Sequence, residues 1–260
     1  SSKRIVIEPR GIKVDPLSGE SITFQISFEH LCEIDMPRPE KGWLDHWQNA
    51  EEKVNAKISK ILAEKRSVFE GKLSYLLSLH MPDRSNFLVA NSMPIRDLEW
   101  FGQKNTSNRK LFGNRGVNGI DGTLGTAMGI AHGSDNPSFL LTGDLAFLHD
   151  SNALLFAKQL KGSLTIFVIN NDGGGIFEHL PISNEPEFEK CFVTPQNFDL
   201  SKLCASFGIK HSMETSWDSI TEKISHPITS GIAVIEIPTD RKKDYLIRQE
   251  LLSISPNSYA

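Results

Sequence analysis

Two short stretches of this 260-residue sequence decide its fold: FLLTGD at residues 139–144 and IFVINNDGGG at residues 166–175. Each is an apolar run that ends abruptly in small and polar residues, as expected for a buried strand that reaches the edge of a parallel sheet. Asn171 follows Asp144 by 27 positions, which leaves room for one helix and a return strand. The two polar ends should therefore meet at the same edge of the sheet.

Further apolar runs alternate with helical patterns on both sides of these stretches. The expected strands are residues 86–90, 110–112, 138–142, 163–169 and 231–237, and the expected helices are 45–64, 73–77, 122–132, 145–159, 199–207 and 217–224. This alternation predicts an α/β fold, with a parallel sheet that is covered by helices on both faces.

The first 40 residues differ from the rest of the chain. Residues 4–7 are typical of a short strand, and the MPRP stretch at 36–39 is typical of a linker, because proline removes a donor and restricts the residue before it. We therefore predict a boundary near residue 40. Residues 1–40 would then be the end of one domain plus a linker, and residues 41–260 would be the ligand-binding domain of a longer protein.

Composition argues against several classes of protein. Lys and Arg number 28 against 32 Asp and Glu, a net charge of −4, which disfavours nucleic acid or an anionic membrane as the main partner. No apolar run reaches the roughly 20 residues that a membrane-spanning helix needs. Cys32, Cys191 and Cys204 have no metal-ligand spacing, which favours a reducing compartment. We therefore expect a cytoplasmic protein, or a plastid stromal one in a plant.

The polar strand ends predict a metal site formed by Asp144, Asn171 and the backbone carbonyl of Gly173. These are hard oxygen ligands, and three of them leave half of an octahedron free for phosphate oxygens and water. Nearby glycine amides can approach a phosphate closely because no Cβ intervenes. We expect Mg²⁺ or Mn²⁺ carrying a diphosphate. The alternative is a helix-capping aspartate beside an Asn-Asp-Gly turn that has no chemical role.

A Gly-Asp pair followed by Asn-Asn at this spacing resembles the motif of thiamine-diphosphate enzymes. Leu145 departs from the common motif, which has a second glycine at that position. Within the family, the chain is similar to the branch of 2-succinyl-5-enolpyruvyl-6-hydroxy-3-cyclohexene-1-carboxylate (SEPHCHC) synthases of menaquinone and phylloquinone biosynthesis. Four stretches carry this similarity: NSMPIR at 91–96, NRGVNGIDG at 114–122, GDL at 143–145 and NNDGGGIFEHLP at 170–181.

The resemblance implies that residues 1–40 are the C-terminal end of a central α/β domain plus a linker. It also implies that residues 41–260 form a diphosphate-binding domain whose cofactor is thiamine diphosphate. The residues that would contact the cofactor are Ile120, Gly143, Asp144, Leu145, Asn171, Gly173, Gly174 and Ile176. Ile120 would be an apolar brace under the bent cofactor. The implied reaction is the decarboxylation of 2-oxoglutarate and addition of the remaining carbanion to isochorismate.

Both implied substrates are dicarboxylates, so the site should contain guanidinium groups. Arg96 and Arg115 meet this requirement, although an isolated arginine is more often a solvated surface residue. Ser92 could cap a helix or donate its hydroxyl to a carboxylate. Ile176, Phe177 and Leu180 would form an apolar wall over the thiazolium, or simply the first turn of a buried helix.

The resemblance also implies that the chain lacks part of its active site. The glutamate that activates the cofactor lies in a separate N-terminal domain of these enzymes, so we assign no certain catalytic residue here. The pyrimidine-binding domain would come from another subunit of a homodimer or homotetramer, and the isolated chain should be inactive. Two alternatives stay open: a decarboxylase or carboligase of the acetolactate synthase type, and a non-catalytic cofactor-binding module.

Overall fold

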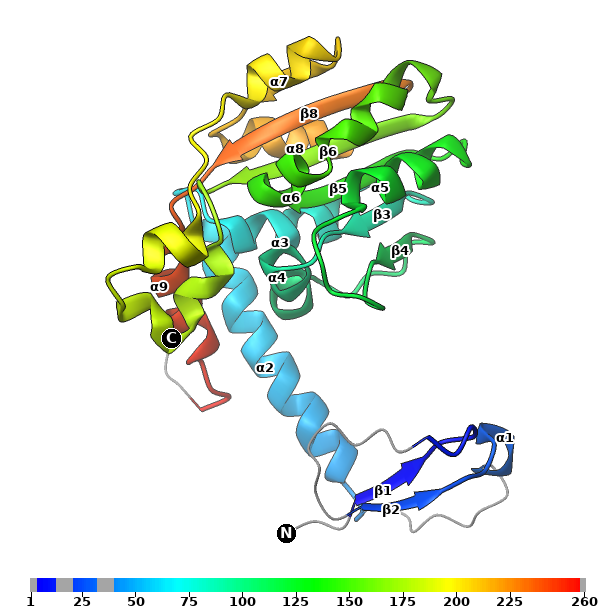
Figure 1. Ribbon diagram of the computed structural model, residues 1–260. Coiled ribbons are helices and arrows are strands. Elements are labelled where there is room, and N and C mark those ends of the chain that lie inside the picture. Colours follow the sequence, from blue (N-terminus) through cyan, green and yellow to red (C-terminus); the bar gives the residue numbers. More distant parts are fainter. Residues whose placement is uncertain (1–3, 13–20, 32–39, 258–260) are drawn as a thin grey trace. The chain divides into compact units, whose positions relative to one another are not determined.

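The computed structural model describes residues 4–12, 21–31 and 40–257 (Figure 1). The chain divides into two compact units, residues 1–49 and 50–260. The predicted linker at residues 36–39 and Cys32 lie outside the described residues. The assignment of the first 40 residues to a preceding domain stays a prediction.

The smaller unit contains a two-stranded parallel sheet. Strand β1 (Arg4–Ile7), which was predicted, pairs with β2 (Ser21–Phe24). A short helix, α1 (Phe28–Leu31), follows. Helix α2 (Trp43–Glu64) begins in this unit and continues into the larger one.

The larger unit is built on a six-stranded parallel sheet with the order β4-β3-β5-β6-β8-β7. The strands are β3 (Asn86–Val89), β4 (Lys110–Gly113), β5 (Ser138–Gly143), β6 (Ser163–Asn170), β7 (Lys210–Met213) and β8 (Gly231–Pro238). From β3 the chain first moves outward to β4 and then returns to β5 on the other side. This reversal is a topological switch point, and ligands of such sheets bind there, beyond the carboxyl ends of the strands.

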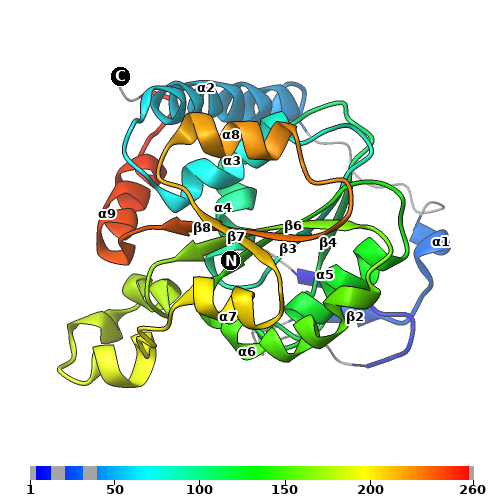
Figure 2. The ribbon, with the colours of Figure 1, turned by 90° about the horizontal axis from the view of Figure 1, so that it is seen from above.

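Helices cover both faces of this sheet, which confirms the predicted α/β fold. On one face lie α3 (Glu70–His80), α4 (Met93–Phe101) and α8 (Trp217–Ser225); on the other lie α5 (Thr123–His132), α6 (Asp144–His149) and α7 (Leu200–Ser206). Figure 2 shows α3 and α8 above the strands and α5, α6 and α7 below them.

Strand β6 shows why both faces must be covered. Leu164, Ile166 and Val168 belong to the core on the α5 side, whereas Phe167 and Ile169 belong to the core on the α3 side. Successive side chains of a strand point to opposite faces, so an uninterrupted apolar run needs a layer of helices on each.

The structure corrects one predicted helix. Residues 145–159 do not form one α-helix: α6 ends at His149, and a 3-10 segment, η1 (Ser151–Gln159), follows. Asp150, between them, has φ −109° and ψ 18°, outside the α-helical region. Its carboxylate accepts a hydrogen bond of 2.9 Å from the backbone N–H of Gly125 in α5. This hydrogen bond fixes Asp150 between α6 and η1.

In the larger unit, one strand and two α-helices were not predicted: β7, α4 and α9 (Arg241–Leu252). Strand β7 is an edge strand without a buried residue, and α9 opens with RKKD, so neither has a strong apolar pattern. Helix α4 begins with Met93-Pro94 and lies in a stretch that was interpreted only as a motif.

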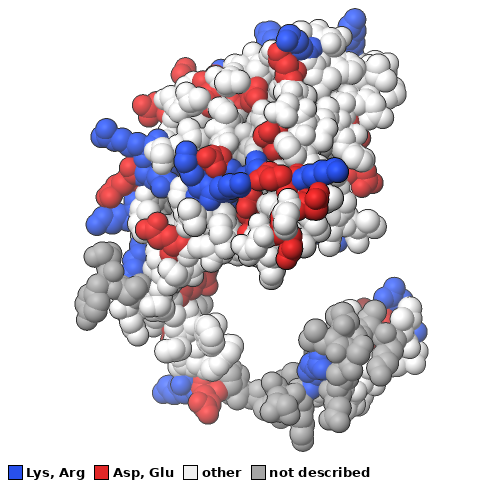
Figure 3. Space-filling model, turned by 60° about the vertical axis from the view of Figure 1, so that its left-hand side comes forward, with Lys and Arg blue, Asp and Glu red and all other residues white. Residues whose placement is uncertain are grey.

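Among the described helices, none combines the length and the apolar character needed to cross a membrane. On the face shown in Figure 3, acidic and basic side chains lie close to one another, and neither sign covers the face alone.

Candidate functional site

A cavity of about 310 Å³ lies at the carboxyl ends of β3, β4, β5 and β6. It brings together nearly all of the predicted site residues: Ser92, Arg96, Arg115, Ile120, Gly143, Asp144, Leu145, Asn171, Gly173, Gly174, Ile176 and Phe177. Leu180 is not part of its lining. This residue is 47% exposed and lies between two 3-10 segments, η2 (Gly175–His179) and η3 (Pro181–Asn184).

Asp144 follows β5 directly and opens α6. The residue is buried, and its carboxylate is held by backbone N–H groups: Gly173 donates to Oδ2 at 2.9 Å and Leu145 donates to Oδ1 at 2.6 Å. Burial raises the pKa of Asp144 to about 6, against the lowering effect of these two hydrogen bonds. A cation in the cavity would offset the cost of keeping this carboxylate ionised.

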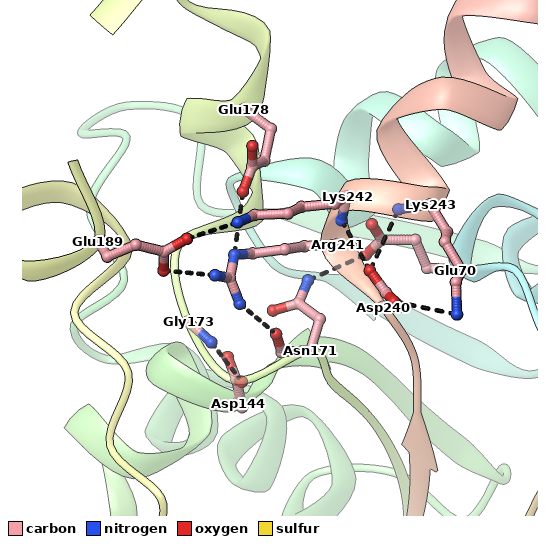
Figure 4. A network of polar contacts seen from close by, with 10 residues as sticks. All are labelled: Glu70, Asp144, Asn171, Gly173, Glu178, Glu189, Asp240, Arg241, Lys242 and Lys243. Atoms are coloured by element: carbon pink, nitrogen blue, oxygen red, sulfur yellow. Dashed lines mark hydrogen bonds and ion pairs between the residues drawn. The ribbon is translucent and has the colours of Figure 1, made fainter. Parts of the chain in front are cut away.

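Asn171 presents a buried amide oxygen that has no hydrogen-bond partner among the described residues. Its Nδ2 points toward the buried carboxylate of Glu70, with 3.5 Å between Nδ2 and Oε2 (Figure 4). An unsatisfied buried acceptor costs about 1–3 kcal/mol. The cost is removed if a ligand in the cavity binds Oδ1, so this oxygen fits the role of a metal ligand.

Gly173 adopts a conformation that requires glycine. Its φ of +135° is rarely adopted by other residues, and a Cβ there would lie 2.4 Å from the carbonyl oxygen of Val193. This conformation directs its N–H to Asp144, while its carbonyl oxygen accepts a hydrogen bond of 2.9 Å from Gly175 and keeps a second lone pair. Gly143 is different, since a Cβ there would meet no described atom within 4 Å.

The oxygen atoms of Asp144, Asn171 and Gly173 fit a hard divalent cation. They are one carboxylate, one unpaired amide oxygen and one backbone carbonyl, all at one cavity. Within the described part of the chain, no group of three or more His, Cys, Asp or Glu side chains could hold a metal. An ion at Asp144 would therefore be held by mixed oxygen ligands and completed by oxygens of a bound molecule or water, as Mg²⁺ prefers.

Two arginines also line the cavity. Arg96 lies in the first turn of α4, where its Nη1 donates to the carbonyl of Ser92 at 2.7 Å. Arg115 follows β4, and its Nη1 donates to Oδ1 of Asn91 at 2.6 Å. Ser92 occupies the N-cap position of α4, but its side chain makes no hydrogen bond to the start of the helix. Its φ of 74° and ψ of −134° are strained for a non-glycine residue, and such strain is common at binding sites.

Next to the cavity lies a buried ionic network that sequence reasoning missed, and one of its members, Glu70, also lines the cavity. Arg248 of α9 bonds Asp97 through Nε at 2.7 Å and Nη2 at 2.8 Å, and its Nη2 lies 2.8 Å from Oε1 of Glu70. These residues and Asp244 are each 0–1% exposed. Burial raises the pKa of Asp97 to about 7 and that of Asp244 to about 8, since one guanidinium cannot compensate three carboxylates.

A second guanidinium from α9 holds the chain segment that forms the apolar wall. Arg241 donates from Nε to Glu178 at 3.0 Å and from Nη1 to the carbonyl of Asn171 at 3.4 Å. Its Nη2 binds Glu189, in the π-helical segment η4 (Glu189–Val193). Figure 4 shows the guanidinium of Arg241 between the end of β6 and the segments η2 and η4. No short motif marks Arg241, because its partners lie 52 to 70 positions away.

Comparison with known proteins identifies relatives of the chain. The family model described as thiamine pyrophosphate enzyme, C-terminal TPP binding domain, matches residues 100–237. The SEPHCHC synthase of Trichodesmium erythraeum (strain IMS101) is 43% identical over 250 residues, which cover 94% of this chain and 43% of that protein. The SEPHCHC synthase of Nostoc sp. (strain PCC 7120) is 40% identical over 255 residues, 96% of this chain and 44% of that protein.

The chain therefore spans less than half the length of these curated relatives. Among solved structures, a Mycobacterium smegmatis protein assigned to the thiamin diphosphate-dependent enzymes matches with a TM-score of 0.52 and 22% identity. The match covers 68% of this chain and 33% of that one, and it supports the fold alone.

Proposed function

The chain belongs to the thiamine pyrophosphate enzymes, as their C-terminal TPP-binding domain, and from this premise we propose that it is the diphosphate-binding part of a SEPHCHC synthase. The proposed reaction decarboxylates 2-oxoglutarate and adds the remaining four-carbon unit to isochorismate. The synthases from Trichodesmium and Nostoc, which align with almost the whole of this chain, support this choice within the family.

The observation that carries the proposal is the pairing of two kinds of group in one cavity. Asp144 and Asn171, whose Oδ1 is unpaired among the described residues, line the cavity together with Arg96 and Arg115. We propose that Asp144, Asn171 and the carbonyl of Gly173 hold Mg²⁺ or Mn²⁺ together with the diphosphate. Thiamine diphosphate, when bound, supplies the electron sink for loss of carbon dioxide.

The protein side chains would bind and orient the substrates. Arg96 and Arg115 would bind the carboxylates, and Ser92 would add a hydroxyl donor. Ile120 would support the cofactor from below, while Ile176 and Phe177 would exclude water from its reactive end. Leu145 lies at the same cavity, next to the metal ligand.

The rest of the active site would come from outside this chain. Following the family, we propose that a pyrimidine-binding domain from another subunit supplies the activating glutamate, in a homodimer or homotetramer. The isolated chain should then be inactive. A cytoplasmic or stromal location stays a prediction from composition.

An assay of the complete enzyme tests the proposal. We expect carbon dioxide release from 2-oxoglutarate with consumption of isochorismate, dependent on Mg²⁺ or Mn²⁺. If pyruvate reacts and this pair of substrates does not, the acetolactate synthase type is the better assignment. If the isolated chain binds Mg²⁺ and thiamine diphosphate tightly in a calorimeter and the complete protein turns over neither substrate set, the chain is a cofactor-binding module.

A further inference from the structure

Asn91 uses both ends of its amide to hold the segment that contains Arg115. The residue lies just beyond the carboxyl end of β3 and is 3% exposed. Its Nδ2 donates to the carbonyl oxygens of Gly119 at 2.6 Å and Asn114 at 3.0 Å. Its Oδ1 accepts from Nη1 of Arg115 at 2.6 Å. One buried side chain therefore fixes two backbone points of residues 114–119 and the guanidinium between them.

This arrangement matters because Arg115 is otherwise poorly restrained. The residue is exposed, and it lies in the irregular segment between β4 and α5. A long side chain that binds a carboxylate loses rotamer freedom, and this loss weakens binding. The hydrogen bond to Asn91 removes part of that freedom before the ligand arrives.

The hydrogen bond to Asn91 leaves free the nitrogens of Arg115 that can bind a carboxylate. The hydrogen bond uses Nη1 of Arg115, which leaves the edge formed by Nε and Nη2 for a ligand. Parallel N–H groups of this kind bind a carboxylate in bidentate fashion. Asn91 thus orients the guanidinium without occupying its carboxylate-binding edge.

Only an amide does all of this at position 91. An aspartate could accept from Arg115, but it could not donate to the carbonyls of Asn114 and Gly119, and its charge would compete with a substrate carboxylate. We propose that Asn91 is a positioning residue: it holds Arg115 and residues 114–119 in the orientation that receives a substrate carboxylate. The inference rests on the proposed function and extends it to a residue that acts through Arg115.

Kinetics of the complete enzyme test this role. The variants are Asn91→Ala, Asn91→Asp and Arg115→Ala, with 2-oxoglutarate and isochorismate as substrates. For the dicarboxylate whose KM rises in Arg115→Ala, we expect Asn91→Ala to raise KM about tenfold and to change kcat less than about threefold. Asn91→Asp should raise this KM at least as much, because its carboxylate pairs with Arg115.

Asn86, at the other end of β3, provides a matched control. It is also 3% exposed, and its Nδ2 donates to Oγ of Ser134 at 2.9 Å and of Ser138 at 3.1 Å, at the amino end of β3. Asn86→Ala should lower the unfolding temperature as Asn91→Ala does, yet leave both KM values within about twofold of the unmodified enzyme. Equal KM increases in both alanine variants would overturn the proposal.

A double variant separates positioning from a general structural effect. If Asn91 acts through Arg115, the variant carrying Asn91→Ala and Arg115→Ala should have the KM of Arg115→Ala alone. Multiplicative increases would overturn the role of Asn91 while leaving the proposed function intact. If the unmodified enzyme does not convert the two dicarboxylates at all, the proposed function fails and the inference fails with it.

Discussion

The ends of β5 and β6 and the ionic network next to them both bury carboxylates, but they compensate the buried charge differently. At the strand ends, Asp144 is held only by backbone N–H groups, and Asn171 keeps an unpaired oxygen in the cavity. In the network, Arg248 closes on Asp97 and Glu70 with ion pairs of 2.7–2.8 Å. The carboxylate of the first region has no ion-pair partner among the described residues, whereas the second region contains its own countercharge, Arg248.

This difference separates binding from stability. Substitutions at the strand ends should reduce function and leave the fold intact, whereas substitutions in the network should reduce the stability of the fold. Asn171 joins the two regions, since its Nδ2 lies 3.5 Å from Oε2 of Glu70 and the residue lines the cavity. Four substitutions test how far the separation holds.

The largest effect is expected from Arg248→Met. It removes the cation that compensates Asp97 and Glu70, and breaking a buried ion pair on one side costs about 3–5 kcal/mol. We expect the free energy of unfolding in urea to fall by that amount. Arg84→Met is the control, because Arg84 is 76% exposed and its contact with Asp83 is 3.8 Å long; it should change stability by less than about 0.5 kcal/mol. Equal stabilities for the two variants would remove the distinction between the regions.

Asp144→Asn should have the next largest effect, on binding rather than on folding. We expect Mn²⁺ affinity, followed by electron paramagnetic resonance, and kcat/KM of the complete enzyme to fall about 100- to 1000-fold, as when one strong electrostatic contact is lost. The unfolding temperature should change little, because two effects oppose each other. The substitution removes the cost of burying a charged carboxylate, and it also removes one hydrogen bond. Metal affinity unchanged from the unmodified enzyme would rule out Asp144 as a ligand.

Asp244→Asn should alter the pH dependence of stability by a smaller amount. The pKa of Asp244 is raised from 3.8 to about 8, so between these values the folded chain keeps a proton that the unfolded chain has lost. Stability therefore falls as pH rises, on the order of 1 kcal/mol per pH unit for this group. Asp97, whose pKa is about 7, contributes to the pH dependence of stability mainly below neutral pH. The change in the free energy of unfolding between pH 7 and 8 therefore comes mainly from Asp244.

Urea unfolding at pH 7 and pH 8 measures this slope directly. We expect Asp244→Asn to remove most of it and the exposed Asp218→Asn to keep it. A slope that persists in Asp244→Asn would show that its proton is not held by the folded network.

The smallest effect is expected for Leu180→Ala, outside both regions. Its side chain is 47% exposed and does not line the cavity, so stability should change by less than about 0.5 kcal/mol and KM by less than about twofold. A tenfold increase in KM would instead support the role that the sequence suggested for Leu180 and require the chain to close over the cofactor.

The two regions also differ in how well the sequence predicts them. Asp144 and Asn171 each follow an apolar strand by one or two positions, so strand periodicity alone places both at one sheet edge. The ion pair of Arg248 and Asp97 joins residues 151 positions apart on two helices that were not predicted. Asn91 lay within a recognised motif, but its role depends on hydrogen bonds to a segment 23 to 28 positions away. Leu180 lies within the same motif as Ile176 and Phe177, and nothing in that motif indicates that Leu180 alone stays outside the cavity lining.

The described residues that line the cavity all lie between Glu70 and Phe177, although both supporting guanidinium groups come from α9 near the end of the chain. A splice variant or proteolytic product that stops after β8 would keep every motif and every lining side chain. It would nevertheless leave Glu70 and Asp97 without their countercharge. The motifs alone therefore do not show whether a protein of this type still has the ion pairs that stabilise its cavity.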